Sequence, residues 1–234
     1  FMPCDEKFVL SSTGALNLQK VPKKVAIVGG GYIGLELGCA LSKLGSEVTV
    51  IEGMDSILAI MDKEIRRPLE IWLKKNKVTG HTNSLARGTK IKGKGASSKV
   101  ELTFEKNSEE QKIIVDKVLV TVGRSPNSRG WGLENMGIRM DTSGRFIRID
   151  RQCRTSAPGV YAIGDVAGEP MLAHKASAQG EMVAEIISGE KREFDKVAIP
   201  AIVFTEPEIV SVGLTPDEAE ERGEEIITGK FPLA

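Results

Sequence analysis

The stretch VAIVGGGYIGLELG at residues 25–38 decides the fold. Glycines at positions 29, 31 and 34 form a G-x-G-x-x-G pattern between an apolar run and a segment with helical spacing. In such a strand–turn–helix context the first glycine permits a tight turn and the second lets the backbone approach a pyrophosphate. The third lets the helix pack on the strand. The pattern therefore predicts a dinucleotide-binding unit.

A carboxylate follows the glycine loop at the distance expected for ribose recognition. Glu52 comes directly after an apolar segment, residues 47–51, that reads as the next strand. A carboxylate there accepts hydrogen bonds from both adenosine ribose hydroxyls and repels a 2′-phosphate. NAD is therefore expected rather than NADP. The alternative is a glycine-rich turn followed by a surface glutamate.

Glu36 adds a second negative charge, in the first turns of the helix that should hold the pyrophosphate. The helix dipole favours an acid near a helix N-terminus. Beside a bound anion, however, the same acid is unfavourable unless it faces away and meets a cation. The sequence offers no obvious cationic partner for Glu36.

The pattern of strands and helices predicts an α/β fold. Its first part is a doubly wound, Rossmann-like domain with an antiparallel insert. The expected elements there are a strand at 25–28, a helix at 32–44, a strand at 47–51, a helix at 62–75 with Asp62 as N-cap, an antiparallel hairpin or meander at 90–115 and a strand at 117–122. Further on we expect strands at 146–149 and 160–163, a helix at 172–187, strands at 201–204 and 209–212, a helix capped by Thr215 and Glu218, and a strand-like ending at 229–234.

Composition and charge argue against several classes of protein. The 234 residues are 41% apolar and carry 32 basic and 32 acidic side chains, which suits a globular core and predicts no nucleic-acid or membrane partner. Cys4, Cys39 and Cys153 lie far apart, without a C-x-x-C pair. No metal site or disulfide framework is expected, and a reducing compartment fits, either the cytoplasm or the mitochondrial matrix of a eukaryote.

A second motif, APGVYAIGDVAGEPMLAHKASAQG at residues 157–180, carries another acid after an expected strand. Asp165 can bind a polyol hydroxyl of a cofactor. The helix that opens at Leu172 could direct its positive end toward an electron-accepting ring. For Asp165 alone, an ordinary turn residue is the alternative.

Six strings together resemble the flavoprotein pyridine nucleotide-disulfide oxidoreductases, and most of all the branch that oxidises dihydrolipoamide. They are SSTGAL (11–16), VGGGYIGLELG (28–38), VTVIE (48–52), VLVTVGRSPN (118–127), VYAIGDVAGEPMLAHKA (160–176) and PAIVFTEPEIVSVGLT (200–215). The resemblance implies the cofactors FAD and NAD, and the order of the strings is that of the family.

The resemblance also implies site residues. NAD-binding positions are Gly29, Gly30, Gly31, Tyr32, Ile33, Gly34, Leu35, Glu36, Glu52, Ala86 and Gly123. FAD-binding positions are Ser12, Thr13, Gly14, Asp165, Met171, Leu172, Ala173 and His174. Tyr32 matches a residue that covers the flavin until nicotinamide arrives. Glu36 matches a carboxylate paired with a lysine of the FAD domain outside this sequence. His174 is expected to act only through its backbone.

The implied domains are a return segment of the FAD domain (1–20), the NAD-binding domain (21–142), a second segment of the FAD domain (143–195) and the start of an α+β dimerisation domain (196–234). The family's redox cysteine pair, its first glycine loop and its histidine base do not occur here. We therefore expect an internal fragment without catalytic residues or activity of its own. The whole enzyme is expected to be a homodimer that serves lipoyl domains of 2-oxo acid dehydrogenase or glycine cleavage complexes.

Two alternatives stay open. One is another flavin reductase of the mercuric, glutathione or coenzyme A-disulfide type. Glu52 argues against the NADPH-linked members, and the string PMLAHKA favours the lipoamide branch. The other alternative is a non-catalytic nucleotide-binding module. A cysteine pair in the residues before Phe1 would exclude that module.

Overall fold

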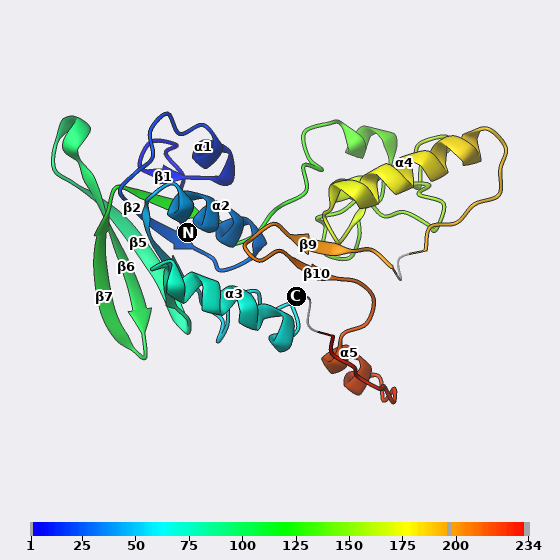
Figure 1. Cartoon of the computed structure of the whole chain (residues 1–234). Coiled ribbons are helices and arrows are strands. Elements are labelled where there is room, and N and C mark those ends of the chain that lie inside the picture. Colours follow the sequence, from blue (N-terminus) through cyan, green and yellow to red (C-terminus); the bar gives the residue numbers. More distant parts are fainter. Residues whose placement is uncertain (1, 196–197, 232–234) are drawn as a thin grey trace. The chain divides into compact units, whose positions relative to one another are not determined.

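A computed structural model describes residues 2–195 and 198–231 and divides the chain into two compact units (Figure 1). The first unit comprises the residues up to Gly123 together with those from Ile202 onward. The second unit runs from Arg124 to Ala201. The glycine loop thus belongs to the first unit and the Asp165 turn to the second.

The first unit is built on a five-stranded parallel sheet with the strand order β1-β8-β2-β3-β4 (Figure 1). Its strands are β1 (Val9–Leu10), β2 (Lys24–Val28), β3 (Glu47–Ile51), β4 (Thr79–His81) and β8 (Lys117–Val120). The predicted α/β class and the strands β2, β3 and β8 are confirmed. The sequence did not predict β1 and β4, because such short runs carry no readable alternation.

Three helices of the first unit follow their predicted positions: α2 (Tyr32–Lys43), α3 (Lys63–Lys75) and α5 (Pro216–Glu221). The short helix α1 (Ser12–Leu16) was not predicted. The Asp62 side chain accepts the Glu64 N–H at 2.7 Å, so the predicted N-cap of α3 is confirmed. The capping box of α5 between Thr215 and Glu218 is confirmed as well.

An antiparallel sheet covers one face of the parallel sheet. Its strands are β5 (Ser84–Lys92), β6 (Lys99–Lys106) and β7 (Glu109–Val115), with η1 (Gly95–Ser97) between β5 and β6. Leu102 and Phe104 of this insert share a core cluster with Ala26 and Val28 of β2. On the other face of β2, Ile27 packs against Gly38 of α2. The predicted insert is therefore confirmed, although it begins earlier than residue 90.

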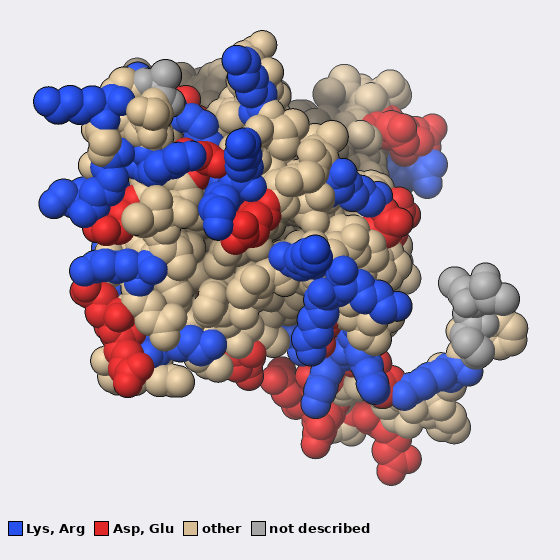
Figure 2. Space-filling model, turned by 60° about the vertical axis from the view of Figure 1, so that its left-hand side comes forward, with Lys and Arg blue, Asp and Glu red and all other residues tan. Residues whose placement is uncertain are grey.

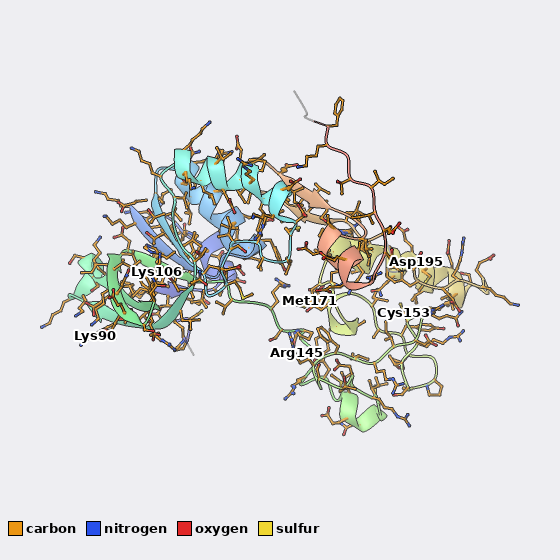
Figure 3. All side chains as sticks on the ribbon, turned by 90° about the horizontal axis from the view of Figure 1, so that it is seen from below. Lys90, Lys106, Arg145, Cys153, Met171 and Asp195 are labelled. Atoms are coloured by element: carbon orange, nitrogen blue, oxygen red, sulfur yellow. The ribbon has the colours of Figure 1, made fainter. Side chains whose placement is uncertain are left out.

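Charged side chains of both signs lie on the surface. Figure 2 shows Lys and Arg interspersed with Asp and Glu on one face. On the insert, Arg87 pairs with Glu105 at 2.7 Å and Lys92 with Glu101 at 3.2 Å. Lys90 and Lys106 lie on the same insert (Figure 3). This mixed surface agrees with the net charge of zero.

The second unit contains little regular structure besides one long helix. Its elements are η2 (Leu133–Met136), η3 (Gly164–Ala167) and α4 (Ala173–Ile187). The strand predictions at 146–149 and 160–163 are wrong, because these segments form only single bridges, Met140–Ile147 and Arg154–Tyr161. Ile147 and Ala162 are buried in a core cluster, so packing in an irregular segment explains the apolar pattern.

A two-stranded sheet follows, formed by β9 (Ala201–Val203) and β10 (Ile209–Ser211). Both strands were predicted. Residues 229–231 of the expected strand-like ending form no strand, and residues 232–234 lie outside the described residues. Within the described ranges, no helix is long and apolar enough to cross a membrane, and no group of His, Cys, Asp and Glu side chains could hold a metal ion.

Candidate functional site

The glycine loop connects β2 to α2 at the carboxyl end of the parallel sheet. Gly29 has a φ of +105°, a left-handed conformation that favours glycine. A Cβ at Gly34 would lie 2.3 Å from the Gly29 carbonyl oxygen and 2.6 Å from Thr121 Oγ1. The inner side of the loop therefore admits no side chain at Gly34, which fits the predicted close packing of helix on strand.

The outer side of the loop is open. A Cβ at Gly31 would meet no atom of the described residues within 4 Å. Gly31 is also the N-cap of α2 and has no side chain that could accept the first N–H groups of the helix. Uncapped N–H groups at a helix start bind anions such as phosphate. The loop therefore fits the pyrophosphate of a dinucleotide.

Glu52 connects the end of β3 to the glycine loop. One carboxylate oxygen, Oε2, accepts the Gly30 N–H at 2.5 Å, and the other, Oε1, accepts the Met54 N–H at 2.7 Å. Because an ionised carboxylate offers about four acceptor positions, Glu52 can also accept hydrogen bonds from the two hydroxyls of a ribose. The predicted ribose acid is thus held next to the predicted pyrophosphate loop.

A neutral histidine lies beside Glu52. The His81 carbonyl accepts the Glu52 N–H at 2.8 Å, and the His81 ring lies 5.1 Å from the Phe104 ring. Burial, with a smaller contribution from Lys106, lowers the pKa of His81. Its buried Nδ1 has no hydrogen-bond partner among the described residues. This histidine therefore adds no positive charge beside Glu52 at neutral pH.

Sequence reasoning missed two residues that support the loop. The Thr121 hydroxyl lies 3.1 Å from the carbonyl oxygens of Val28 and Gly29 and ties β8 to the loop. Arg66 of α3 is buried, and its Nη1 donates to the Ile57 carbonyl at 2.9 Å. Their burial results from tertiary packing, so no local pattern indicates these roles.

The other predicted NAD positions lie in the same unit. Tyr32 and Ile33 form the half-buried start of α2, whereas the Leu35 side chain is in the core. Ala86 lies at an irregularity of β5 and packs against the core between the two sheets. Gly123 follows β8 with a φ of +132°. A role of Leu35 toward a nucleotide would therefore have to come from its backbone.

Glu36 has a hydrogen-bond partner within the chain. Its Oε1 accepts the Phe204 N–H at 2.9 Å, directly after β9. About two helix turns further on, Lys43 of α2 pairs with Glu206. Glu36 thus meets a backbone dipole of the β9–β10 connection. Its pairing with a lysine outside this sequence stays a prediction.

Ser12, Thr13 and Gly14 form most of the short helix α1. The Ser11 hydroxyl caps this helix by accepting the Gly14 N–H at 3.2 Å. A Cβ at Gly14 would lie 1.8 Å from Glu6 Oε2, the end of an exposed side chain that would have to move to admit it. The contact of this segment with FAD stays a prediction.

In the second unit, Asp165 lies in η3, and its Oδ2 pairs with Arg124 Nη2 at 3.3 Å. Arg145 in turn donates to the Arg124 carbonyl at 2.9 Å. Leu172 is the N-cap of α4, and its apolar side chain cannot accept the helix N–H groups. An acid beside an uncapped helix start fits the polyol and ring of a flavin.

Met171 and Ala173 flank the start of α4, and Met171 is labelled in Figure 3. The His174 ring is engaged, because its Nε2 lies 2.8 Å from the Pro200 carbonyl oxygen. The contact requires the proton on Nε2. A bound ring agrees with the expectation that His174 would meet a flavin only through its backbone, which stays untested.

Comparison with known proteins identifies the family to which the chain is similar. A family model described as pyridine nucleotide-disulphide oxidoreductase matches residues 3–180. The model of the dimerisation domain of the same family matches residues 199–234. Curated relatives named dihydrolipoyl dehydrogenase, from Bacillus subtilis and Pseudomonas aeruginosa, are each 47% identical and match 97% of this chain. The matches cover 47% of each relative, so the chain spans about half the length of these relatives.

Solved structures agree with this result. LpdA from Mycobacterium tuberculosis matches with a TM-score of 0.82 and 30% identity, over 93% of this chain and 46% of that one. The HOCl-induced flavoprotein disulfide reductase RclA from Escherichia coli matches with a TM-score of 0.82 and 28% identity, over 94% of this chain and 49% of that one.

Proposed function

The chain belongs to the pyridine nucleotide-disulphide oxidoreductase family, and we propose that the whole protein is a dihydrolipoamide dehydrogenase that uses FAD and NAD. The observation that carries this proposal is the 47% identity, over 97% of the chain, to curated dihydrolipoyl dehydrogenases. In this reaction the dithiol of dihydrolipoamide is oxidised to a disulfide. Two electrons and one proton pass to NAD⁺, and the second proton is released.

The first unit provides the NAD site in this proposal. N–H groups at the start of α2 hold the pyrophosphate, and the open space at Gly31 admits it. Glu52, kept in place by the Gly30 N–H, accepts the hydroxyls of the adenosine ribose. Since a 2′-phosphate would meet this carboxylate, the site selects NAD over NADP. Tyr32 and Glu36 lie at the start of the same helix, toward the nicotinamide.

The second unit provides part of the FAD site. The Asp165 carboxylate accepts a ribitol hydroxyl, and the start of α4 directs its N–H groups toward the ring. FAD, when bound, relays the two electrons between the dithiol and NAD⁺. Ser12, Thr13 and Gly14 of α1 supply further backbone contacts to FAD. The four domain segments of the sequence prediction remain part of this proposal.

The partners follow from the same assignment. Residues 199–234 match the start of a dimerisation domain, and we propose that the whole protein is a homodimer. Its substrates are lipoyl domains of 2-oxo acid dehydrogenase or glycine cleavage complexes. Its compartment is the cytoplasm, or the mitochondrial matrix in a eukaryote.

The experiment is a substrate comparison with the purified whole protein. We expect FAD at about one equivalent per chain and NADH formation from dihydrolipoamide and NAD⁺. Glutathione disulfide, coenzyme A disulfide and mercuric ion, each tested with NADH and NADPH, are the matched alternatives. Turnover of one of these in place of dihydrolipoamide would assign the protein to another branch of the family. A protein without flavin or turnover would support the non-catalytic module.

A further inference from the structure

The η3 turn that carries Asp165 is hydrogen-bonded at both of its ends by side chains of α4. At the first end, the Gly164 N–H donates to Gln179 Oε1 at 2.8 Å. At the other end, the Lys175 ammonium donates to the carbonyl of Gly168, the C-cap of η3. Lys175 and Gln179 are four residues apart, so they lie on the same face of the helix.

Both side chains are buried. Lys175 is 2% exposed and Gln179 is 1% exposed. The same face of α4 continues with Met182, Val183 and Ile186, which are apolar and also buried. Burying an amide or an ammonium is unfavourable unless hydrogen bonds compensate. The polar residues therefore occur where the helix meets the turn, and apolar residues occupy the rest of the face.

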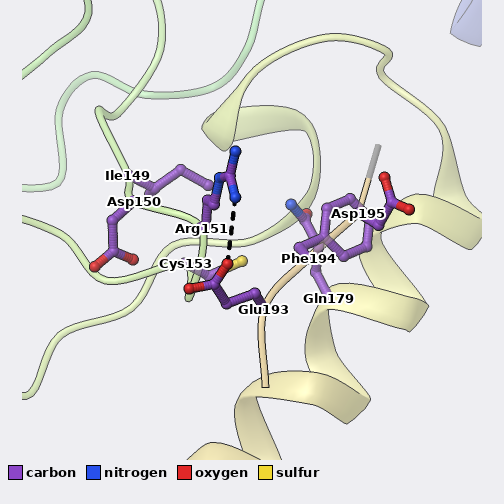
Figure 4. Close-up of a pocket in the computed structure, with 8 residues that line it drawn as sticks. All are labelled: Ile149, Asp150, Arg151, Cys153, Gln179, Glu193, Phe194 and Asp195. Atoms are coloured by element: carbon purple, nitrogen blue, oxygen red, sulfur yellow. Dashed lines mark hydrogen bonds and ion pairs between the residues drawn. The ribbon is translucent and has the colours of Figure 1, made fainter. Parts of the chain in front are cut away.

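The turn also lies very close to the helix. A Cβ at Gly164 would lie 2.9 Å from the Ala176 Cβ, and Gly164 has a φ of +73°. Gly168, at the other end, has a φ of +121°. Two left-handed glycines thus bracket Asp165, and α4 fixes the turn by contact as well as by hydrogen bonds. Gln179 is also one of the residues that line a cavity of about 740 Å³ (Figure 4).

We propose that Lys175 and Gln179 are positioning residues that hold the η3 turn at both ends and thereby set the Asp165 carboxylate for a polyol hydroxyl of the flavin. This inference rests on the proposed function, since it needs a flavin at Asp165. It adds that the orientation of the Asp165 carboxylate depends on Lys175 and Gln179. The helix that directs its N-terminus toward the cofactor also holds the acid that binds the cofactor.

The test measures the FAD dissociation constant of the whole protein after reversible removal of the flavin. Gln179→Leu and Lys175→Met each remove one hydrogen bond to the turn, and we expect at least a tenfold weaker binding of FAD. Gln179→Glu keeps an acceptor and Lys175→Arg keeps a donor, so each should recover most of the affinity. Gln152→Leu is the matched control, because the Gln152 amide donates to the Arg192 carbonyl in the same unit, away from the turn.

A double-mutant cycle with Asp165→Asn separates positioning from general stabilisation. If Gln179 acts through Asp165, Gln179→Leu should weaken FAD binding by less than twofold when Asp165→Asn is already present. A merely structural residue would weaken binding equally in both backgrounds. Unfolding of the apoprotein is followed in parallel. If Gln179→Leu does not fold, Gln179→Asn, which shortens the amide by one methylene, replaces it.

The outcomes are distinct. Non-additive losses with recovery in the conservative variants support the inference. Additive losses, or unchanged FAD binding in Gln179→Leu and Lys175→Met, overturn it and leave the proposed function intact. A wild-type whole protein that binds no FAD overturns the proposed function, and the inference with it.

Discussion

The Glu52 carboxylate accepts the Gly30 N–H at 2.5 Å, which joins the end of β3 to the glycine loop. One residue thus meets both parts of the proposed NAD site, the loop for the pyrophosphate and the acid for the ribose. The same bond explains why Glu52 is held beside the loop before any nucleotide arrives. A substitution of Glu52 should therefore affect both the shape of the loop and the choice of nucleotide.

We predict that Glu52→Ala weakens NADH binding by about 5- to 150-fold, because a hydrogen bond to a charged acceptor is worth ~1–3 kcal/mol. NADPH binding should weaken less or improve, since the repulsive carboxylate is gone. Glu52→Gln keeps an acceptor oxygen for the loop without the charge, so it should lose discrimination more than affinity. Calorimetric titration of both nucleotides measures this. Equal affinity of the wild type for NADH and NADPH would contradict the assignment.

The glycine loop offers a matched pair of substitutions. Gly34→Ala should lower the free energy of unfolding by ~1–3 kcal/mol, because its Cβ would lie 2.3 Å from the Gly29 carbonyl oxygen. Gly31→Ala places its Cβ in open space and should cost below about 1 kcal/mol, as a poorer N-cap. It should nevertheless abolish tight NADH binding by occupying the space of the pyrophosphate. Urea unfolding and NADH titration of both variants check this, and normal NADH affinity of Gly31→Ala would refute it.

The sequence predicts the elements around the glycine loop well, because their signals are local. Helical spacing and the glycines define α2, and the Asp62 cap defines the start of α3. The strands expected at 146–149 and 160–163 fail for the opposite reason. Their apolar residues are buried, but the Ile147 and Ala162 N–H groups bond to Val166 and Cys153 outside any ladder. Burial alone does not distinguish a strand from an irregular core segment.

Among the site residues, too, those with a local sequence signal can be predicted and those that depend on tertiary packing cannot. The sequence indicates Glu52 and Asp165 as candidate cofactor-binding acids by their positions after strand-like runs, and these roles stay predictions. The supporting roles of Arg66, Lys175 and Gln179 cannot be predicted, because such residues at helical spacing look like a solvated surface. The hydrogen-bond partner of Glu36 could not be predicted from the sequence either, because Phe204 is 168 residues away in the chain.

The Glu36–Phe204 hydrogen bond predicts a local change in hydrogen exchange. Glu36→Ala removes the acceptor, so the Phe204 amide should exchange at least several-fold faster, with less than about 1 kcal/mol lost in global stability. Glu36→Gln retains an acceptor oxygen and should protect the amide almost as well. Glu47→Ala, at the far end of β3, is the control. If the exchange rate of the Phe204 amide is the same in the wild type and in all three variants, another group protects this amide.

The Cys39 thiol predicts a pH dependence of stability. Burial raises its pKa from 9.0 to about 11, with a further increase from Glu36 and a decrease from Lys43. Because the folded state keeps the thiol proton to a higher pH than the unfolded chain, the contribution to stability is complete below pH 9. It is lost as the pH rises toward about 11, and at ~1.36 kcal/mol per pKa unit it amounts to about 3 kcal/mol. Denaturant unfolding between pH 8 and 11 should show a decline that is shallower in Cys39→Ala. Thiol labelling at pH 8 gives an independent measure. Cys39 should react more slowly than exposed Cys4, because Cys39 is buried from the reagent and its pKa of about 11 leaves little thiolate. Burial and the neighbours Glu6 and Asp5 raise the pKa of Cys4 too, so exposure is what distinguishes the two thiols. Equal slopes in the wild type and Cys39→Ala, or rapid labelling of Cys39, would show that this thiol titrates as an ordinary exposed one.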